Sequence, residues 1–327
     1  MNKRRVGILG LGAYLPEKVL TNFDLEKIVD TSDEWIKTRT GIRERRIAEK
    51  GTPTSELAAR AAKEAIQNAG LKPTDIDLII LATISPDMLF PSTACIVQEK
   101  IGARCPGFDL SAACSGFTYA LALGEGLVQS GAYKHILVIG AEVISGFINW
   151  KDRSTCVLFG DGAGAAILGE VHDGHGILAT YLGADGSQSK LLQIPAGGSA
   201  IPPSADSISA GLHYVQMEGS EVFKSAVRTM GDAIAEVIKR ANLKLEDIDC
   251  LIPHQANLRI LSAVSEKSGI PMEKVYVNLD RYGNMSAAST AVAFYEAVKE
   301  GKVKKNSNVV LVAFGSGLTW AACAIRW

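Results

Sequence analysis

The sequence predicts an α/β fold built from two similar halves, and three observations support this. Apolar residues make up 47% and charged residues 21% of the 327 residues, which is typical of a globular protein with a large core. Short, almost continuously apolar runs alternate with amphipathic stretches, as in buried sheets covered by helices. Finally, a segment that begins at Leu71 recurs at Leu243.

The recurring segment is residues 71–80, which match residues 243–252 at an offset of 243 − 71 = 172. Leu, Lys, Asp, Ile, Asp and a final Ile are shared in the same order. The helical stretch upstream and an apolar run downstream keep nearly the same offset. A register held over three elements indicates an internal duplication. We therefore predict an N-terminal half at residues 1–172 and a C-terminal half at residues 173–327.

The expected elements follow from this alternation. A first core strand is expected at Val6–Leu11, because the apolar run there is too short and too rich in glycine for a secretion signal. The other buried strands are expected at Ile76–Ala82, Ile136–Ala141, Ala163–Leu168, Ile248–Ile252, Val309–Phe314 and Ala321–Ile325. Helices are expected at about Pro53–Ala69, Ser115–Ser130, Gly219–Ala241, Leu258–Ser268 and Ser286–Glu300. The Gly-, Ser- and Pro-rich stretch Gly183–Leu212 is predicted to be an irregular surface loop near the junction of the halves.

The bulk properties argue against several classes of protein. A formal net charge of -1 disfavours nucleic acid or a membrane surface as the main partner. No apolar run is long enough to span a bilayer. The six cysteines form no C-x-x-C pair and follow no regular spacing, which disfavours a disulfide framework and a zinc site. We expect a cytoplasmic protein that holds no metal.

The most informative segment is the small-residue turn Ser111–Thr118, which brings Cys114 to the start of the apolar helical run Tyr119–Leu127. A thiol placed there lies beside unpaired backbone N–H groups and the positive end of the helix dipole. Both favour the thiolate, which is the nucleophilic form of cysteine. A free cysteine packed as a small apolar residue is an equally good interpretation of this segment alone.

The duplication extends the argument to the C-terminal half. Adding 172 to Ala82 gives His254, at the end of a predicted strand, and adding 172 to Cys114 gives Ser286, just after Asn284. If a pseudo-twofold axis relates the halves, Cys114, His254 and the Asn284 turn lie at corresponding strand ends and could face one another. A structural histidine and a turn or helix-capping asparagine are the alternatives.

Cysteine, histidine and asparagine together suit attack on a thioester or amide carbonyl. Neutral His and Asn side chains can also donate hydrogen bonds to a carbonyl oxygen that becomes anionic. No acidic residue adjoins His254 in the sequence, which favours a hydrogen-bond donor over a general base.

Two further segments suit ligand binding. The strand–turn–strand Phe314–Thr319 is rich in glycine, so its backbone could approach a ligand and donate an N–H; an ordinary β-turn is the alternative. Trp35 and Arg39 lie four residues apart on one helix face and could hold an adenine ring and a phosphate, or be part of a solvated basic face. Gly10–Gly12 and Gly160–Gly164 lack the features of a dinucleotide site.

Taken together, these motifs resemble β-ketoacyl-acyl carrier protein synthase III, the initiating condensing enzyme of bacterial fatty-acid synthesis. The resemblance spans essentially the whole chain, through Thr31–Arg46, Ala113–Phe117, Phe159–Ala166, His254–Asn257, Gly283–Ser289 and Phe314–Trp320, in family order. It implies a thiolase-like fold with two α/β halves in five αβαβα layers, and a homodimer. It also implies a decarboxylative Claisen condensation of an acyl-CoA, with acetyl-CoA as the expected primer, and malonyl-acyl carrier protein.

The resemblance also implies roles for individual residues. Cys114 would carry the acyl group as a thioester, while His254 and Asn284 would stabilise the enolate formed by decarboxylation. The backbone N–H groups of Cys114 and Ser316 would hold the tetrahedral oxyanion, although many members have glycine in place of Ser316. Asn284 separates this family from elongating condensing enzymes, which have histidine in that role, and from thiolases, which have a second cysteine.

Substrate contacts are implied in the same way, and acyl-CoA is a substrate, so no cofactor is expected. The CoA contacts would be Thr31, Trp35, Arg39, Arg153 and Asn257. The carrier-protein contacts would be Gln255, Ala256, Asn257, Leu258 and Arg259. Phe90 would cross the dimer and close the acyl pocket, which suggests a short primer. Ser220 replaces an asparagine that contacts CoA in some relatives.

Three alternatives stay open on the sequence. A condensing enzyme of secondary metabolism with another starter would have the same motifs. A thioesterase or amidase could use the same Cys, His and Asn, but it would need a water route and a basic histidine. A non-catalytic module that binds a carrier protein would have no need of all three side chains.

Overall fold

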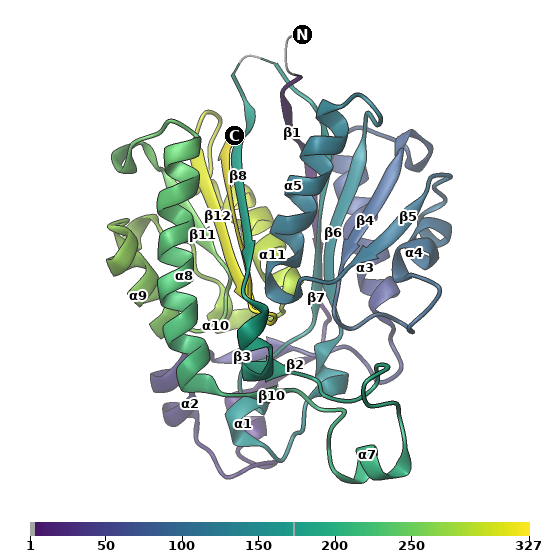
Figure 1. Cartoon of the computed structure of the whole chain (residues 1–327), viewed down its shortest axis with the longest axis vertical. Coiled ribbons are helices and arrows are strands. Elements are labelled where there is room, and N and C mark those ends of the chain that lie inside the picture. The colour runs from purple at the N-terminus through teal and green to yellow at the C-terminus, as the bar shows by residue number, and fades with distance from the viewer. Residues whose placement is uncertain (1–3, 173) are drawn as a thin grey trace.

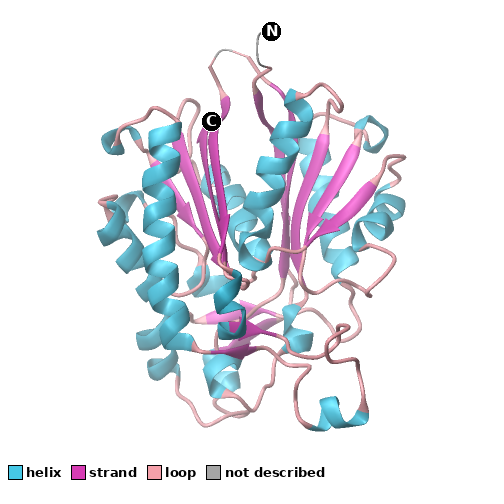
Figure 2. Cartoon of the chain, in the orientation of Figure 1, coloured by secondary structure: helices cyan, strands magenta, loops and turns pink. Residues whose placement is uncertain are grey.

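Two β-sheets and three layers of helices alternate in the computed structural model, which describes residues 4–172 and 174–327 (Figure 1). Helices α3 (Thr54–Asn68) and α4 (Thr93–Ile101) cover the outer face of the first sheet, and α8 (Gly219–Arg240) covers that of the second. Helices α5 (Gly116–Gln129) and α11 (Ala287–Lys299) lie between the sheets (Figure 2). The expected αβαβα order of layers is confirmed.

The two sheets repeat one strand order. The first contains β1 (Val6–Tyr14), β7 (Gly162–Glu170), β6 (Ile136–Glu142), β4 (Leu78–Ala82) and β5 (Gly107–Leu110), in that order. The second contains β8 (Gly176–Ala184), β13 (Thr319–Arg326), β12 (Asn308–Gly315) and β11 (Cys250–Pro253). In each sheet the second strand pairs antiparallel with both the first and the third, and the fourth pairs parallel with the third. The duplication predicted from the sequence is therefore present in the topology.

The matching segments also fold alike in detail. The Lys72 backbone N–H donates to the Asp75 carboxylate at 2.8 Å, and the Lys244 N–H donates to the Asp247 carboxylate at 2.8 Å. Each bond closes a short 3₁₀ turn that leads into a buried parallel strand. The repeated sequence thus specifies the same entry into each sheet.

Close packing explains the small residues of the core. A Cβ atom on Gly140 of β6 would lie 2.5 Å from the Ala287 carbonyl oxygen, at the start of α11. A Cβ on Gly10 of β1 would lie 2.5 Å from the Ala65 carbonyl oxygen in α3. Glycine is required where helices sit this close to a strand. The Gly10–Gly12 pattern therefore serves packing.

The remaining elements gather below the sheets in Figure 1, on the side where the site lies. They are β2 (Val19–Thr21), α1 (Asn22–Leu25), α2 (Asp33–Thr40), β3 (Glu44–Arg46), α6 (Arg153–Cys156), β9 (Leu192–Gln193), α7 (Ala205–Ser209), β10 (Gln216–Met217) and α10 (Leu279–Tyr282). Helix α9 (Leu258–Ser268) packs beside α8.

Most expected elements are present within two or three residues of their predicted ends, but some were missed. The sequence did not indicate β5, β8 or α4. The stretch Gly183–Leu212 is not simply a surface loop, since Leu192 and Ile194 pack with the buried Ile144 and Phe159. The predicted division at residues 172–173 stays a prediction, because residue 173, like residues 1–3, lies outside the described part of the chain. No helix of residues 4–172 and 174–327 is long and apolar enough to cross a bilayer.

Candidate active site

The turn between β5 and α5 places Cys114 at the centre of the molecule. Ala113, Cys114 and Ser115 form a 3₁₀ turn, and Ala113 has φ of 47°, a left-handed value that is uncommon outside glycine. The next residue, Gly116, starts α5, and a Cβ there would lie 2.8 Å from Ala82 at the end of β4. Cys114 is thereby held at the sheet edge with 6% of its surface exposed.

The hairpin between β12 and β13 closes over this turn. A Cβ on Gly315 would lie 2.6 Å from the Cys114 backbone nitrogen, so glycine is required for this approach. The Thr319 hydroxyl donates to the Ala112 carbonyl at 3.0 Å, and the Ser115 hydroxyl donates to the Thr319 carbonyl at 3.1 Å. These two hydrogen bonds, one donated by each segment, hold the hairpin against the Ala113–Ser115 turn, which we call the nucleophile turn.

His254 and Asn284 reach the site from the second half. His254 follows β11, and its backbone N–H donates to the Val312 carbonyl at 2.7 Å. Asn284 is fixed by backbone bonds to Leu158 at 2.8 Å and Gly160 at 3.0 Å. Both side chains line one cavity of about 280 Å³ together with Cys114. The structure thus brings the three residues singled out from the sequence into one cavity.

The orientation of the Asn284 amide follows from a local bond. Its side-chain oxygen accepts a hydrogen bond from the Ser286 backbone N–H at 2.8 Å. Since the oxygen is engaged there, the NH₂ group is the part of the amide left to donate to a ligand.

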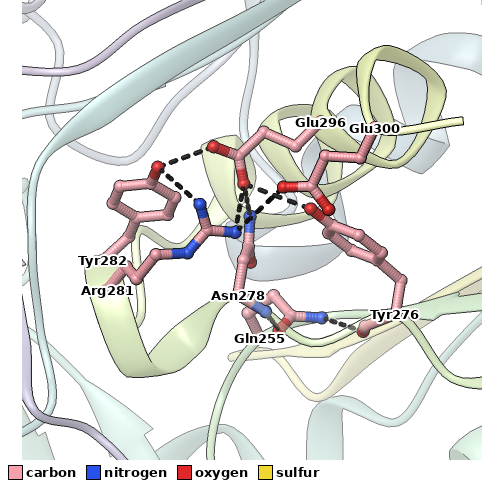
Figure 3. Close-up of polar contacts among 7 residues, drawn as sticks. All are labelled: Gln255, Tyr276, Asn278, Arg281, Tyr282, Glu296 and Glu300. Carbon is pink, nitrogen blue, oxygen red and sulfur yellow. Dashed lines mark hydrogen bonds and ion pairs between the residues drawn. The ribbon is translucent and has the colours of Figure 1, made fainter. Parts of the chain in front are cut away.

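A polar network joins residues next to His254 and Asn284 in the sequence to helix α11 (Figure 3). The Gln255 amide donates to the carbonyls of Pro253 at 2.7 Å and Tyr276 at 3.1 Å, and its oxygen accepts from the Asn278 N–H at 3.0 Å. Glu296 of α11 accepts from the side chains of Asn278 at 2.9 Å, Arg281 at 3.0 Å and Tyr282 at 2.6 Å. The segments that carry His254 and Asn284 are therefore tied to the same helix.

Burial sets the protonation of the two central groups. Loss of hydration lowers the pKa of His254 to about 3, so the imidazole is neutral near pH 7. Its Nδ1 atom has no hydrogen-bond partner within the described residues. Burial raises the pKa of the Cys114 thiol to about 12, and the nearby Ser286 hydroxyl lowers it only in part. Burial in the free protein therefore works against the thiolate that the sequence-based argument from the helix start favours.

A second cavity, of about 370 Å³, meets the first at Cys114. Its wall is mainly apolar and is formed by Ile84, Ile144, Phe159, Leu192, Ile194 and Val215. Ser316 and Ser286 lie on this side, whereas His254 and Asn284 lie on the other. The thiol thus faces this apolar chamber and also the first cavity, whose wall is likewise mainly apolar but carries the polar groups of His254 and Asn284.

Three of the five residues expected to contact CoA line the first cavity. These are Trp35, Arg39 and Asn257. Arg153 stacks 4.9 Å from the Trp35 ring centre and donates to the Asp30 carbonyl at 2.9 Å. Thr31 is not among the residues that line the cavity.

The residues expected to contact a carrier protein differ in exposure. Leu258 and Arg259 are exposed at the start of α9, and Ala256 and Asn257 are half-buried. Gln255 is fully buried, and its amide bonds to its own chain. Its predicted contact with a carrier protein was therefore wrong, because the side chain braces the His254 loop from within. Phe90 is 84% exposed and lines neither cavity.

Glu142 was missed by the sequence analysis. It ends β6 and is fully buried near the cavity wall, and burial raises the pKa of its carboxyl to about 7. A carboxylate that ends an otherwise apolar run, Ile136–Ala141, was the available signal. Among the described residues, no group of three or more His, Cys, Asp or Glu side chains could hold a metal ion.

Comparisons with known proteins agree with this arrangement. The family described as 3-oxoacyl-[acyl-carrier-protein] synthase III matches residues 108–186, and its C-terminal counterpart matches residues 238–327. Beta-ketoacyl-[acyl-carrier-protein] synthase III of Caldanaerobacter subterraneus is 58% identical over 99% of this chain and 98% of that protein. The protein of the same name from Clostridioides difficile is 56% identical over 99% and 98%. The solved 3-oxoacyl-[acyl-carrier-protein] synthase III of Aquifex aeolicus is 52% identical over 98% of this chain and all of that one, with a TM-score of 0.91.

Proposed function

This chain belongs to the 3-oxoacyl-[acyl-carrier-protein] synthase III family, and from that premise we propose its substrates and the roles of its residues. It is an acyl-transferring condensing enzyme. The proposed reaction joins an acyl-CoA to malonyl-acyl carrier protein with loss of carbon dioxide, which gives a 3-oxoacyl-acyl carrier protein and initiates fatty-acid synthesis. The observation that carries the assignment is the single cavity lined by Cys114, His254 and Asn284.

In the first half-reaction, the Cys114 sulfur attacks the thioester carbonyl of acyl-CoA, and CoA leaves as its thiolate. The carbonyl oxygen becomes an oxyanion next to the backbone N–H groups of Cys114 and Ser316. Gly315 supports this role, because only glycine lets the hairpin approach the Cys114 nitrogen. Oriented donors of this kind typically contribute 10²–10³ to the rate of acyl transfer.

In the second half-reaction, the malonyl group of malonyl-acyl carrier protein enters the first cavity and loses carbon dioxide. His254 and the Asn284 NH₂ group donate to the thioester oxygen, where the enolate charge develops. A neutral imidazole suits this task, and burial keeps the pKa of His254 far below 7. The enolate carbon then attacks the acyl-Cys114 carbonyl, and the cysteine leaves with the new carbon–carbon bond formed.

The two cavities suit the two ends of the primer. The acyl chain enters the apolar chamber beside Cys114, and the CoA moiety passes out between Trp35 and Arg39. The Arg153 and Arg39 guanidinium groups lie 4.9 Å and 5.9 Å from the Trp35 ring centre, so an adenine stacked on this ring would lie beside two cations suited to phosphate. Arg259, exposed beside the first cavity, suits an acidic carrier protein.

A homodimer is part of this proposal. Met88, Leu89 and Phe90 are 48%, 81% and 84% exposed, and three adjacent apolar side chains on one loop favour burial against another chain. The partner's Phe90 would close the apolar chamber and limit the primer to a short chain.

Hydrolysis of a thioester or amide is a weaker alternative. It requires a histidine that can take a proton from water. The low pKa of His254, and the absence of a described hydrogen-bond partner for its Nδ1 atom, leave nothing that would make it basic.

A primer panel tests the proposed function. Acetyl-, isobutyryl- and octanoyl-CoA are each incubated with malonyl-acyl carrier protein, and product masses are recorded. We expect a 3-oxoacyl product that is formed best from acetyl-CoA. Release of free acid without any 3-oxoacyl product would instead identify a hydrolase.

A further inference from the structure

Glu142 is a buried acid that the proposed reaction does not use. Its carboxylate accepts hydrogen bonds from the Thr83 hydroxyl at 3.1 Å, the Ile84 N–H at 3.2 Å and the Ser85 N–H at 3.1 Å. The Ser85 hydroxyl adds a fourth bond at 2.5 Å. All four donors are neutral groups, so these hydrogen bonds stabilise the carboxylate but do not balance its negative charge. Such a group is costly to bury, which makes a purely structural role a poor explanation.

The packing of three elements brings Glu142 close to the nucleophile. The start of α11 lies against β6, since a Cβ on Gly140 would approach the Ala287 carbonyl within 2.5 Å. The start of α5 lies against the same helix, since a Cβ on Gly116 would be 3.5 Å from Ala287. Ile84, whose N–H binds Glu142, lines the same cavity as Cys114 and Ser286. The carboxyl end of β6 and the thiol therefore flank the turn that holds Ser286.

Ser286 lies between the acid and the thiol. It is fully buried, and its backbone φ is 47°, a left-handed value that is uncommon outside glycine. Its hydroxyl is near enough to lower the pKa of both Cys114 and Glu142, yet it forms no hydrogen bond of normal geometry within the described residues. A buried hydroxyl in this position is free to donate to one neighbour while it accepts from the other.

Resting on the proposed function, we propose that Glu142 receives the Cys114 proton through the Ser286 hydroxyl during acylation and returns it when the cysteine is released. In acylation the sulfur bonds to the acyl carbon, its proton passes to Ser286, and the Ser286 proton passes to Glu142; CoA leaves as thiolate. In condensation the enolate carbon bonds to the acyl carbon and the cysteine leaves as thiolate. The Glu142 proton then returns through Ser286, which restores the thiol and the carboxylate.

The protonation of the groups supports this path. Burial raises the pKa of Glu142 to about 7, so near neutral pH both of its forms are populated. Cys114 is the titratable group that faces it, from the turn before α5. The groups that face it from the β4 end and from α11 are the non-titrating Thr83, Ser85 and Ser286. Asp161, the buried carboxylate of the neighbouring strand region, is engaged by Ala48 and Ser145.

The test measures the rate of Cys114 alkylation by iodoacetamide from pH 5 to 9, which needs neither CoA nor a carrier protein. We expect an inflection near pH 7 in the wild-type protein. Glu142→Gln and Ser286→Ala should both lose the inflection and react at least tenfold more slowly at pH 7.5. Ser85→Ala removes a donor to the carboxylate and should move the inflection to higher pH.

The matched control is Thr290→Ala, which removes another buried hydroxyl without a described partner from the same helix end. It should leave the pH profile unchanged. An inflection that survives in Ser286→Ala would overturn the proposal, as would a wild-type profile without one; Ser286→Ala decides the question even if Glu142→Gln folds poorly. Acylation by acetyl-CoA is measured separately, so a wild-type protein that shows the inflection but takes no acetyl group would contradict the proposed function and not the proton path.

Discussion

The Asn284 side-chain oxygen accepts the Ser286 backbone N–H at 2.8 Å, and this bond decides which end of the amide faces the substrate. An asparagine held in this way is a donor in the cavity. The backbone N–H of Ser286, two residues later in the turn, thus determines that the Asn284 side chain can act only as a donor there.

Asn284→Ala should separate the two half-reactions. Acylation of Cys114 does not use the amide and should proceed within about threefold of wild type. Decarboxylation should fall roughly 10²- to 10³-fold, the usual effect of removing one donor from a developing oxyanion. Asn284→Asp should be at least as slow, since a carboxylate repels the enolate. Intact-protein mass spectrometry follows the first step and release of carbon dioxide the second; a normal condensation rate in Asn284→Ala would refute the assigned role.

Gly315→Ala should damage acylation specifically. The new methyl group would lie 2.6 Å from the Cys114 nitrogen, so the hairpin or the nucleophile turn must move. We expect at least a hundredfold slower acylation by acetyl-CoA, because a displaced N–H no longer meets the oxyanion. Gly126→Ala in α5 is the matched control, since its Cβ meets open space, and it should retain full activity. Equal acylation rates in the two variants would contradict the close approach inferred for Gly315.

Trp35→Ala should weaken CoA binding. Stacking of a base on an aromatic ring contributes about 1–3 kcal/mol, so the KM for acetyl-CoA should rise roughly tenfold or more, while the KM for malonyl-acyl carrier protein changes little. Trp150→Ala is the control, because Trp150 lines a separate hollow with Lys18 and Val143. An unchanged KM for acetyl-CoA in Trp35→Ala would remove the stacking role.

His254 should make the fold sensitive to acid. Burial lowers its pKa from 6.5 to about 3, so between those pH values the unfolded chain binds a proton that the folded protein does not. His254 therefore does not reduce the free energy of unfolding above pH 6.5, and it reduces that free energy progressively as the pH falls from 6.5 toward 3. From pH 7 to pH 5, wild type should lose about 2 kcal/mol more than His254→Gln.

Urea unfolding of both proteins across this range measures the difference. Glu142 acts in the opposite sense, because its raised pKa of about 7 makes the folded protein bind the extra proton between about pH 4.5 and 7. That contribution is common to both proteins and cancels in the comparison. Parallel curves of unfolding free energy against pH would show that His254 is not held neutral by burial.

Sequence periodicity was enough for the α/β alternation and the duplication, whereas the five αβαβα layers were expected only from the family resemblance. Buried parallel strands such as β4 and β11 are continuous apolar runs, and their shared entry turns repeat residue by residue. Strand β8 was missed because it carries half-buried and exposed residues, with an apolar pattern too weak to distinguish from a loop. The stretch Gly183–Leu212 was predicted to be a surface loop because it is rich in Gly, Ser and Pro. These residues indicate a lack of regular structure, but a segment without regular structure can still pack against the site, as Leu192 and Ile194 do.

The positions of the three site residues could be predicted because they follow from the topology of the two duplicated halves. Cys114, His254 and Asn284 end corresponding segments of duplicated units, and the sheets bring such ends together. Protonation was not predictable, because the pKa of Cys114 depends on how completely the hairpin around Gly315 and the helix starts exclude water. The buried position of Gln255 depends on contacts with Tyr276 and Asn278 some twenty residues away, which no local pattern reveals.

The measurement that bears most directly on the whole account is the mass of the protein, and of its proteolytic peptides, after incubation with acetyl-CoA alone. We expect one acetyl group on the peptide that contains Cys114, none on the Cys114→Ser variant, and normal labelling of Cys95→Ser, which alters an exposed cysteine. A wild-type protein with Cys114 unmodified, or with the acetyl group on another residue, would contradict it.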